Sequence, residues 1–263
     1  VQHTSIMRAG LMELLILLQT LRLDSAARIT AVAPYLCYGR SDKKDQPRVP
    51  ITSRLVANII QIAGADRYMT LDPHAYQIQG FFSVPGDVLN ASHILSAYVL
   101  KNLRPYLKDP VVVTADLGYA KKGRNFAARI DTPIAFIEKR RIANDAKAEA
   151  LTIIGDVEGR DILLIDDEID TGRSIIQAIN LIKENGAQRI YTVFVHPIFS
   201  GDAAQRLAAL PVTEFITTDS VPITPDKQEA FGKRLTILTV APLLGEVIRR
   251  AHEGRSVGQM FNE

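Results

Sequence analysis

Cysteine is almost absent from this sequence, since Cys37 is the single one among 263 residues. A disulfide framework and a cysteine-based zinc site are therefore excluded, and a reducing, cytoplasmic environment is expected. The sequence also lacks an apolar run of the ~18 residues that a membrane-spanning helix needs. Its net charge of +2 is too small to indicate nucleic acid or a membrane surface as a partner. With 47% hydrophobic residues, the chain is typical of a soluble globular protein.

A secretory leader is missing as well, and because the chain begins with Val1, we expect a native N-terminal segment to be absent. Apolar, β-branched runs alternate with helical patterns, which predicts α/β layers with mostly parallel sheets. The expected strands are 29–34, 111–115, 133–137, 161–165, 190–195, 212–217 and 235–240. The expected helices are 11–23, 51–63, 91–103, 175–184 and 242–252, with stops at Gly64 and Gly186. We predict two similar doubly wound domains, 1–90 with the C-terminal helix 242–263, and 91–241.

The most informative segment, Ile162–Ser174, reads ILLIDDEIDTGRS. Its apolar start is typical of a parallel strand buried on both faces, and the spacing that follows is typical of a helix. The turn between them therefore lies at the carboxyl end of a strand. There, backbone N–H groups of residues 170–174 and the hydroxyls of Thr171 and Ser174 can hold a phosphate dianion at the helix N-terminus.

Three aspartates belong to this segment, Asp166, Asp167 and Asp170. They could simply cap the helix, but capping needs one acid rather than three. Asp166 and Asp167 suit a sugar diol, because carboxylates accept hydrogen bonds from vicinal hydroxyls. The arrangement resembles the phosphoribosyl-diphosphate loop that phosphoribosyltransferases and ribose-phosphate diphosphokinases share. The loop alone does not separate these two families.

A second charged segment, Tyr38–Arg48, carries four cations and two acids in eleven positions. Such a segment can wrap a polyphosphate, or it can be a solvated surface loop. It continues as RVPITSRLVAN from Arg48, and later come GADR at 64–67 and DPHAYQIQGFF from Asp72. These stretches closely resemble ribose-phosphate diphosphokinase, and the likeness runs nearly end to end, through Ser256–Val257. The histidine-containing stretch is its more specific part, since transferases lack it.

The resemblance implies domains of the phosphoribosyltransferase type and an Mg²⁺-dependent reaction. In this reaction, ribose 5-phosphate receives the diphosphoryl group of ATP at its C1 hydroxyl, and AMP is released. By the same resemblance, the ATP site contains Arg40, Ser41, Asp42 and His74, and the metal lies at His74 and Asp116. Ribose 5-phosphate is expected at Asp166, Asp167, Asp170, Thr171, Gly172, Arg173 and Ser174.

Three adjacent cations, Lys139, Arg140 and Arg141, follow a predicted strand. They repel one another unless an anion joins them, although a solvated basic turn explains the sequence equally well. The resemblance maps Lys139 and Arg141 onto the family's catalytic pair in a flexible loop. Cations that close over phosphates suit a transfer that needs charge stabilisation and in-line alignment.

Several positions differ from the family's usual residues, namely Ser41, Pro73, Leu117, Tyr119 and Arg173. A glycine is usual in place of Arg173, and a side chain there would be strained if the backbone required positive φ. Otherwise its guanidinium turns outward or adds a contact to the phosphate.

The resemblance further implies homodimers that assemble into hexamers, with an acidic N-terminal loop of one subunit contacting adenine in its neighbour. This chain lacks that loop, so we expect weak ATP binding. Two other functions stay open: a phosphoribosyltransferase, and a non-catalytic synthetase-associated subunit that regulates active partners. A Walker-type kinase is excluded, because no Gly-x4-Gly-Lys-Ser/Thr occurs.

Overall fold

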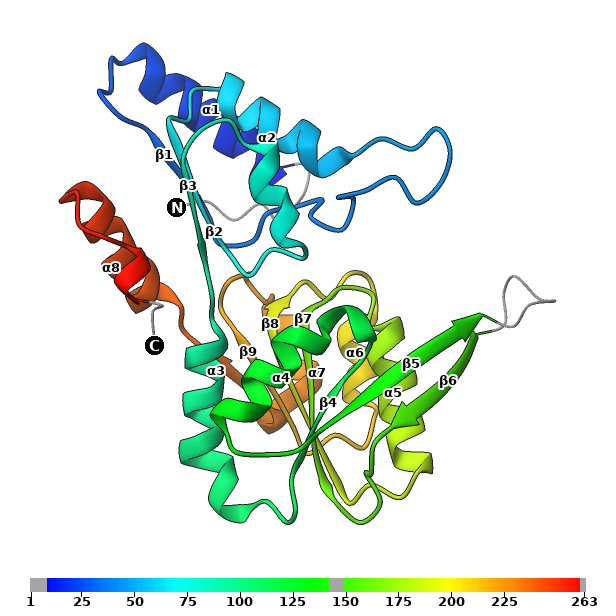
Figure 1. Ribbon diagram of the computed structural model, residues 1–263. Coiled ribbons are helices and arrows are strands. Elements are labelled where there is room, and N and C mark those ends of the chain that lie inside the picture. The colour runs from blue at the N-terminus through cyan, green and yellow to red at the C-terminus, as the bar shows by residue number, and fades with distance from the viewer. Residues whose placement is uncertain (1–8, 142–148, 261–263) are drawn as a thin grey trace. The chain divides into compact units, whose positions relative to one another are not determined.

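The computed structural model describes residues 9–141 and 149–260, with the backbone alone at 9, 140, 141, 149 and 150. The chain forms two compact units, which Figure 1 shows. Unit 1 contains residues up to Ala91 together with Ser220–Pro222 and the segment from Thr239, and unit 2 contains Ser92–Asp219 and Ile223–Leu238. Within the described ranges, no helix is long and apolar enough to cross a membrane.

Unit 1 is built on a parallel three-stranded sheet in the order β1-β2-β3. The strands are β1 (Thr30–Ala33), β2 (Arg67–Leu71) and β3 (Gly86–Leu89). The helices are α1 (Ala9–Leu23), α2 (Thr52–Ile62) and α8 (Ala241–His252), with 3-10 turns at Tyr76–Phe81 and Gly258–Met260. Gly64, with φ 120°, follows α2, as its proposed role as a helix stop requires.

The two faces of this small sheet differ in character. One face carries Ala31 and Tyr68, which belong to a buried core with Leu14 of α1 and Ile60 of α2. Side chains alternate along a strand, and the register pairs β1 with β2 and β2 with β3. The opposite face therefore carries a different set: Thr30, Val32, Arg67, Met69 and Asp87. Polar and charged residues are thus built into one side of unit 1.

Unit 2 is built on a seven-stranded sheet in the order β10-β9-β8-β7-β4-β5-β6, in which β6 alone is antiparallel to its neighbour. The strands are β4 (Val111–Thr114), β5 (Ile134–Arg141), β6 (Glu149–Ile154), β7 (Asp161–Ile169), β8 (Arg189–Pro197), β9 (Glu214–Thr218) and β10 (Leu235–Leu238). The helices are α3 (Ser92–Tyr98), α4 (Ala120–Arg129), α5 (Arg173–Glu184), α6 (Ala203–Ala208) and α7 (Pro225–Phe231). Short turns lie at Val99–Leu103, Arg104–Tyr106, Leu117–Tyr119 and Gly232–Arg234.

Helices cover both faces of the unit 2 sheet. On one face, Leu164 packs in a large core with Ile179 of α5 and Leu207 of α6. On the other, α4 lies so close that a Cβ added at Gly123 would be 2.4 Å from Thr114 Cγ2. Burial on both faces explains the continuous apolar run at the start of β7, and the predicted α/β class with mostly parallel sheets is confirmed.

The structure also contains elements that the pattern did not predict. Strands β2, β3 and β6 were not expected, because β2 begins with a charged residue, β3 is short and polar at its start, and β6 begins within a polar stretch. The helix expected at 91–103 ends at Tyr98 and continues as a π turn and a 3-10 turn. Pro105 explains why regular α-helical bonding does not continue through Arg104–Tyr106, because proline has no backbone N–H to donate to the residue four positions earlier.

Candidate functional site

Three acids gather at the carboxyl end of the unit 2 sheet. Strands β4 and β7 are parallel neighbours, with Thr114 opposite Ile165. Asp116 follows β4, while Asp166 and Asp167 belong to β7, and the Asp116 charge acts on Asp166. The expected end of this strand at Ile165 is wrong, because pairing with β8 continues four residues further. Asp166 and Asp167 are therefore held by a strand rather than by a loop, whereas Asp116 lies in the turn after β4.

The carboxylates of Asp116, Asp166 and Asp167 repel one another electrostatically. Burial raises the pKa of the Asp166 carboxyl well above its usual value, and the neighbouring charges of Asp167 and Asp116 raise it further. The Asp167 N–H donates to Asp166 Oδ1 at 2.9 Å, and the Glu168 N–H donates to Asp167 Oδ1 at 2.9 Å. Carboxylates fixed in this way can accept hydrogen bonds from hydroxyl groups or attract a cation.

Asp116 is oriented by the turn that follows β4. Its Oδ1 atom accepts the Tyr119 N–H at 3.0 Å and so caps the 3-10 turn Leu117–Tyr119. The Thr114 hydroxyl donates to the Asp116 backbone oxygen at 2.9 Å. Because Asp116 is exposed, this orientation leaves the carboxylate accessible to a ligand.

The turn after β7 suits an anion. Gly172 has φ 73°, and a Cβ added there would lie 3.3 Å from Leu207 Cδ1, so glycine is required. α5 begins at Arg173, and the first N–H groups of a helix have no partner within it. Thr171 is exposed, and Asp170 Oδ1 is buried without a hydrogen-bond partner among the described residues. The turn thus presents donors to an incoming phosphate.

Arg173 does not strain this turn. As the first residue of α5, it has a helical backbone, and the left-handed conformation falls on Gly172 instead. Its side chain is exposed, and no described residue forms a hydrogen bond or ion pair with it. The steric conflict considered from the sequence is therefore absent.

The basic end of β5 reaches the same turn. Lys139 Nζ donates to Ser174 Oγ at 3.1 Å. Lys139 and Arg141 lie in a strand rather than in the implied flexible loop, because β5 pairs with β6 as far as Arg141 and Glu149. The Arg141 side chain and residues 142–148 lie outside the described residues. Of the predicted catalytic pair, the structure thus locates Lys139 at the phosphate turn.

In unit 1, Ser41 holds the start of α2. Its Oγ atom accepts the Thr52 N–H at 3.2 Å, and its backbone oxygen accepts the Ser53 hydroxyl at 2.9 Å. These bonds give Ser41 a local structural role at the position where the family usually has glutamine.

The other residues predicted for ATP lie close to this helix start. Asp42 is buried, and Gln77 Nε2 donates to its Oδ2 atom. A Cβ added at Gly39 would lie 3.7 Å from His74 Cβ, so the two segments are adjacent. Arg40 and His74 are exposed. Sequence reasoning missed Gln77, although it belongs to the same specific stretch as His74.

Known proteins similar to this chain carry consistent names. A ribose-phosphate pyrophosphokinase of Aquifex aeolicus is 43% identical over 252 residues, covering 96% of this chain and 79% of that protein. One from Chlorobaculum tepidum is 43% identical over 262 residues, covering 100% of this chain and 79% of that protein. The crystal structure of phosphoribosylpyrophosphate synthetase from Mycobacterium smegmatis is 40% identical, with a TM-score of 0.86, covering 93% of this chain and 78% of that chain.

A parallel α/β sheet with acids, a glycine turn and a helix start at its carboxyl end defines a protein with the phosphoribosyltransferase type of fold. Two family models match: the N-terminal domain of ribose phosphate pyrophosphokinase over residues 1–64, and the phosphoribosyl synthetase-associated domain over residues 140–262. The chain belongs to the ribose-phosphate pyrophosphokinase family. It is an enzyme of the transferase class, and the family inferred from the sequence motifs is confirmed.

Proposed function

We propose that the enzyme transfers the diphosphoryl group of ATP to the C1 hydroxyl of ribose 5-phosphate in the presence of Mg²⁺. The C1 oxygen loses its proton and bonds to the β-phosphorus, while the bond from the β-phosphorus to the oxygen of the α-phosphate breaks and AMP leaves. The contact between Lys139 and Ser174 carries the proposal, because it sets a cation beside the turn that suits a phosphate. We assign the reaction to the cytoplasm, where a chain with a single buried cysteine needs no disulfide.

Ribose 5-phosphate binds at the carboxyl end of β7. The N–H groups at the start of α5, with the hydroxyls of Thr171 and Ser174, hold the 5-phosphate. Asp166 and Asp167 accept hydrogen bonds from the ribose hydroxyls, so they orient the sugar. The remaining turn residues complete this assignment: Asp170, Gly172 and Arg173.

Lys139 and Arg141 stabilise the charge that builds up during transfer. Phosphoryl-group transfer needs positioning and electrostatic stabilisation more than covalent chemistry. A cation held by Ser174 is positioned before substrate arrives, which supports this role for Lys139. Arg141 keeps its assignment from the sequence resemblance.

The acids of unit 2 suit Mg²⁺ that arrives with substrate. Among the described residues, no group of three or more His, Cys, Asp and Glu side chains is arranged to hold a metal ion by itself. Mg²⁺ is usually held by one or two carboxylates together with substrate phosphates. Asp116, whose charge acts on Asp166, supplies such a ligand. His74 of unit 1 keeps its assignment to metal binding from the sequence resemblance. When bound, Mg²⁺ offsets the charge of the transferred group.

ATP binds through unit 1, at Arg40, Ser41, Asp42 and His74. The hydrogen bond between Asp42 and Gln77 supports this assignment, since it joins the two segments that carry these residues. We accordingly assign residues 1–90 with helix 242–263 to the nucleotide, and residues 91–241 to ribose 5-phosphate.

Homodimers that assemble into hexamers belong to the same proposal. Helix α1 is apolar around much of its circumference, and several large side chains on it are exposed, with Ile16 at 59% and Leu23 at 74%. Such a helix is stabilised when another apolar surface covers it. Light scattering of the purified protein tests the assembly, and a monomer at micromolar concentration would contradict it.

The assay that tests the reaction uses ATP, Mg²⁺ and ribose 5-phosphate, with AMP formation as the readout. We expect Lys139→Ala to lower turnover by roughly 10³-fold, because a stabiliser of developing charge is removed. Lys101→Ala is the matched control, since Lys101 is an exposed lysine in the segment before β4.

Two results would contradict the proposal. Absence of AMP here, together with release of diphosphate when 5-phosphoribosyl 1-diphosphate and a nucleobase are supplied instead, would indicate a transferase. Absence of both activities from folded protein would indicate an inert subunit. A turnover number of Lys139→Ala equal to that of Lys101→Ala would remove Lys139 from the mechanism without affecting the reaction assignment.

A further inference from the structure

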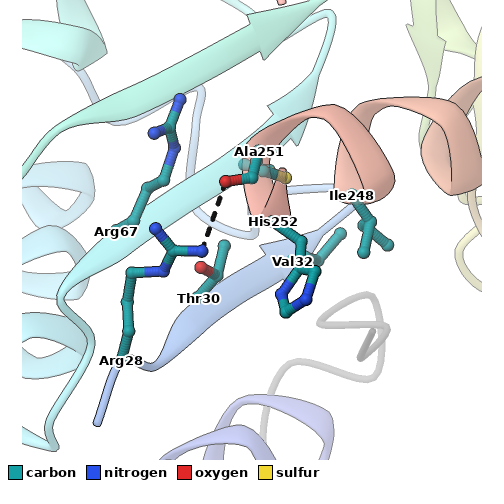
Figure 2. A pocket seen from close by; sticks show the side chains of 8 residues that line it. Arg28, Thr30, Val32, Arg67, Ile248, Ala251 and His252 are labelled. Atoms are coloured by element: carbon teal, nitrogen blue, oxygen red, sulfur yellow. Dashed lines mark hydrogen bonds between the residues drawn. The ribbon is translucent and has the colours of Figure 1, made fainter. Parts of the chain in front are cut away.

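Unit 1 contains a pocket, and its lining includes none of the residues that we assign to the reaction. It has a volume of about 300 Å³ and lies between the polar face of the sheet and α8. Figure 2 shows its side chains: one group comes from strands β1 and β2 and from Arg28 in the segment before β1, and the other comes from the last turns of α8. The lining residues are Arg28, Thr30, Val32, Arg67, Met69, Ile248, Ala251 and His252. Pockets of small-molecule sites begin at about this size.

The lining combines an apolar floor with basic groups. Val32, Met69 and Ala251 are buried apolar residues, and Ile248 adds a partly exposed one. Arg28, Arg67 and His252 are the basic members, and the lining contains no acidic residue. A surface of this kind favours a molecule that carries an anionic group on an apolar body.

The two arginines differ in how strongly other residues of the protein already bind their guanidinium groups. Arg67 forms a bidentate pair with Asp87, with Nε and Nη2 each 2.8 Å from a carboxylate oxygen. Its charge is therefore largely offset. Arg28 uses one N–H group, which donates to the Ala251 backbone oxygen at 3.2 Å (Figure 2). No other described residue bonds to this guanidinium, so its remaining N–H groups can meet an anion, and the contact with α8 holds it at the pocket.

We propose that this pocket binds a small amphipathic anion, in which a phosphate or carboxylate group meets Arg28 and His252 and a flat apolar body lies on Val32, Met69 and Ile248. The Thr30 hydroxyl is a further donor at the same face. The site is separate from the residues proposed for ATP and ribose 5-phosphate, so its occupation does not depend on the proposed reaction.

Methyl NMR spectroscopy of the full chain tests the proposal, because Val32, Met69, Ile248 and Ala251 supply methyl groups inside the pocket. The probe is phenyl phosphate. Inorganic phosphate lacks the apolar body, and phenol lacks the charge. We expect saturable shifts of the methyl signals of these four residues with phenyl phosphate, at an affinity about tenfold or more above that of either fragment. Equal affinity for inorganic phosphate, or no shift at these methyl groups, overturns the proposal.

Benzoate separates the two kinds of anionic group. Tighter binding of phenyl phosphate than of benzoate assigns the site to phosphates, and the reverse order assigns it to carboxylates. Either order supports an amphipathic anion site, whereas failure of both to shift the pocket methyl signals contradicts it.

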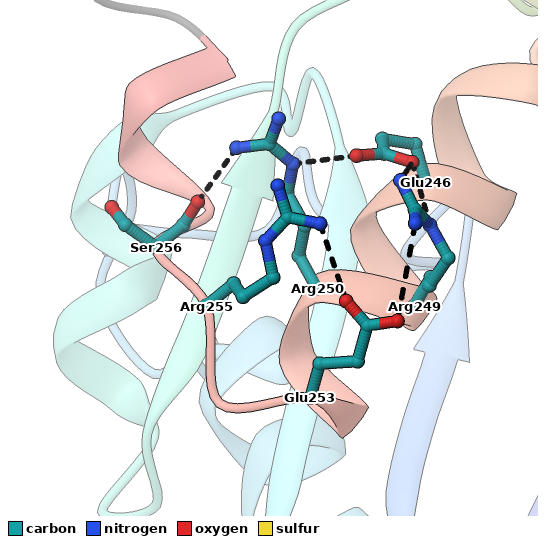
Figure 3. A network of polar contacts seen from close by, with 6 residues as sticks. All are labelled: Glu246, Arg249, Arg250, Glu253, Arg255 and Ser256. Atoms are coloured by element: carbon teal, nitrogen blue, oxygen red, sulfur yellow. Dashed lines mark hydrogen bonds and ion pairs between the residues drawn. The ribbon is translucent and has the colours of Figure 1, made fainter.

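Substitutions of the basic residues test whether they bind the anionic group of the ligand. Arg28→Gln is expected to weaken phenyl phosphate binding about tenfold, since a charge-assisted hydrogen bond is lost. Arg255→Gln is the control, because Arg255 is an exposed arginine near the same helix end, paired with Glu253 in a surface network outside the pocket (Figure 3).

A second variant, His252→Asn, tests the proposal independently, because Arg28→Gln could also displace α8 by removing the bond to the Ala251 oxygen. His252 is exposed, and the variant is expected to weaken binding several-fold, because the shorter amide does not replace the imidazole Nε2 as a donor. Wild-type affinity in both Arg28→Gln and His252→Asn would show that the arginine serves only to hold α8, and that the pocket is not an anion site.

Discussion

The two ends of strand β7 hold aspartates in opposite circumstances. Asp161, at the start, has a fully buried side chain that accepts bonds from the Arg189 guanidinium and from the Lys108 N–H. Burial favours a higher pKa for the Asp161 carboxyl, but these donors outweigh burial and lower it. Asp166, five residues later, has a raised pKa because of burial and neighbouring carboxylates. One strand thus carries a carboxylate that is stabilised by donors, Asp161, and a carboxylate that is destabilised by neighbouring negative charges, Asp166.

This difference separates stability from function within a single element. A buried carboxylate paired with a guanidinium stabilises the native state relative to the same carboxylate left alone. A crowded carboxylate destabilises the free protein, and ligands that donate hydrogen bonds or carry positive charge relieve it. The amino end of β7 therefore anchors the sheet, while Asp166 nearer the carboxyl end retains repulsion that a hydrogen-bond donor or a cation would reduce.

The largest effect is expected from Asp166→Asn. The amide oxygen can still accept the Asp167 N–H, but the charge that receives the ribose hydroxyls is lost. We expect turnover to fall by roughly a hundredfold or more, the scale seen when one positioned polar group is removed from a site. At the same time, thermal unfolding at neutral pH should move up by a few degrees, because repulsion is removed. Steady-state AMP formation and calorimetry measure the two effects.

Asp161→Asn provides the contrast at the other end of the strand. It should lower the unfolding temperature. If Asp166→Asn lowered the unfolding temperature as well, the carboxyl end of β7 would be an anchor too, and the comparison would be broken.

The next effect is a loss of stability in Arg189→Met. The variant leaves the Asp161 carboxylate buried with the backbone N–H groups of Lys108 and of residue 189 as donors. We expect a loss of roughly 2–3 kcal/mol, less than the ~3–5 of a fully buried pair because the Arg189 side chain is 39% exposed. Arg160→Met, which removes a surface pair with Asp156, should cost less than about 1 kcal/mol. Urea unfolding compares the two variants, and equal losses would contradict the prediction.

The pH dependence of stability sharpens the comparison further. The contribution of Asp161, whose pKa is lowered, is present above the ordinary carboxyl value of about 4 and is lost as the pH falls through its native pKa. The contribution of Asp166, whose pKa is raised, is present below about 4 and is lost as the pH rises through its native pKa. Urea unfolding across pH should show that Asp161→Asn flattens the acid side and Asp166→Asn the side above about pH 4. Identical profiles for the two variants would refute the assignment.

The smallest effect concerns Arg173→Gly, which restores the glycine usual in the family. Loss of an exposed cation beside the phosphate should raise KM for ribose 5-phosphate about three- to tenfold at low salt, with little change in kcat. Arg173→Lys keeps the charge and should remain near the wild-type value. A KM for Arg173→Gly that is unchanged at low salt would show that the guanidinium turns away from the phosphate.

The sequence alone predicted the elements whose pattern of apolar residues is determined by burial. The apolar start of β7 and the helix after it followed from hydrophobic spacing. The left-handed conformation of Gly172 did not, because the sequence resemblance pointed to position 173 for it. The family followed from motifs around His74, which no composition argument would have supplied. The contacts of Asp161 with Arg189 and Lys108 were not predicted, because residues far apart in the chain meet there through sheet register.

Pairing between strands explains what the sequence did not predict. The acids after Ile165 and the cations after Glu138 look like loop residues, yet both groups belong to strands because β8 and β6 supply backbone partners. Local polarity does not reveal such partners. For the same reason, the contact of Lys139 with Ser174 was beyond sequence reasoning, and it is the contact that locates Lys139 in the site.

The beginning of α5 divides two tasks between neighbouring residues. Gly172 takes the left-handed conformation and the close approach to Leu207, so the path of the backbone is set before the helix starts. Arg173 is then an ordinary helical position with an exposed side chain. Evolution or a protein engineer can therefore vary position 173 to adjust affinity for a phosphorylated substrate in small steps, because the shape of the turn does not depend on it.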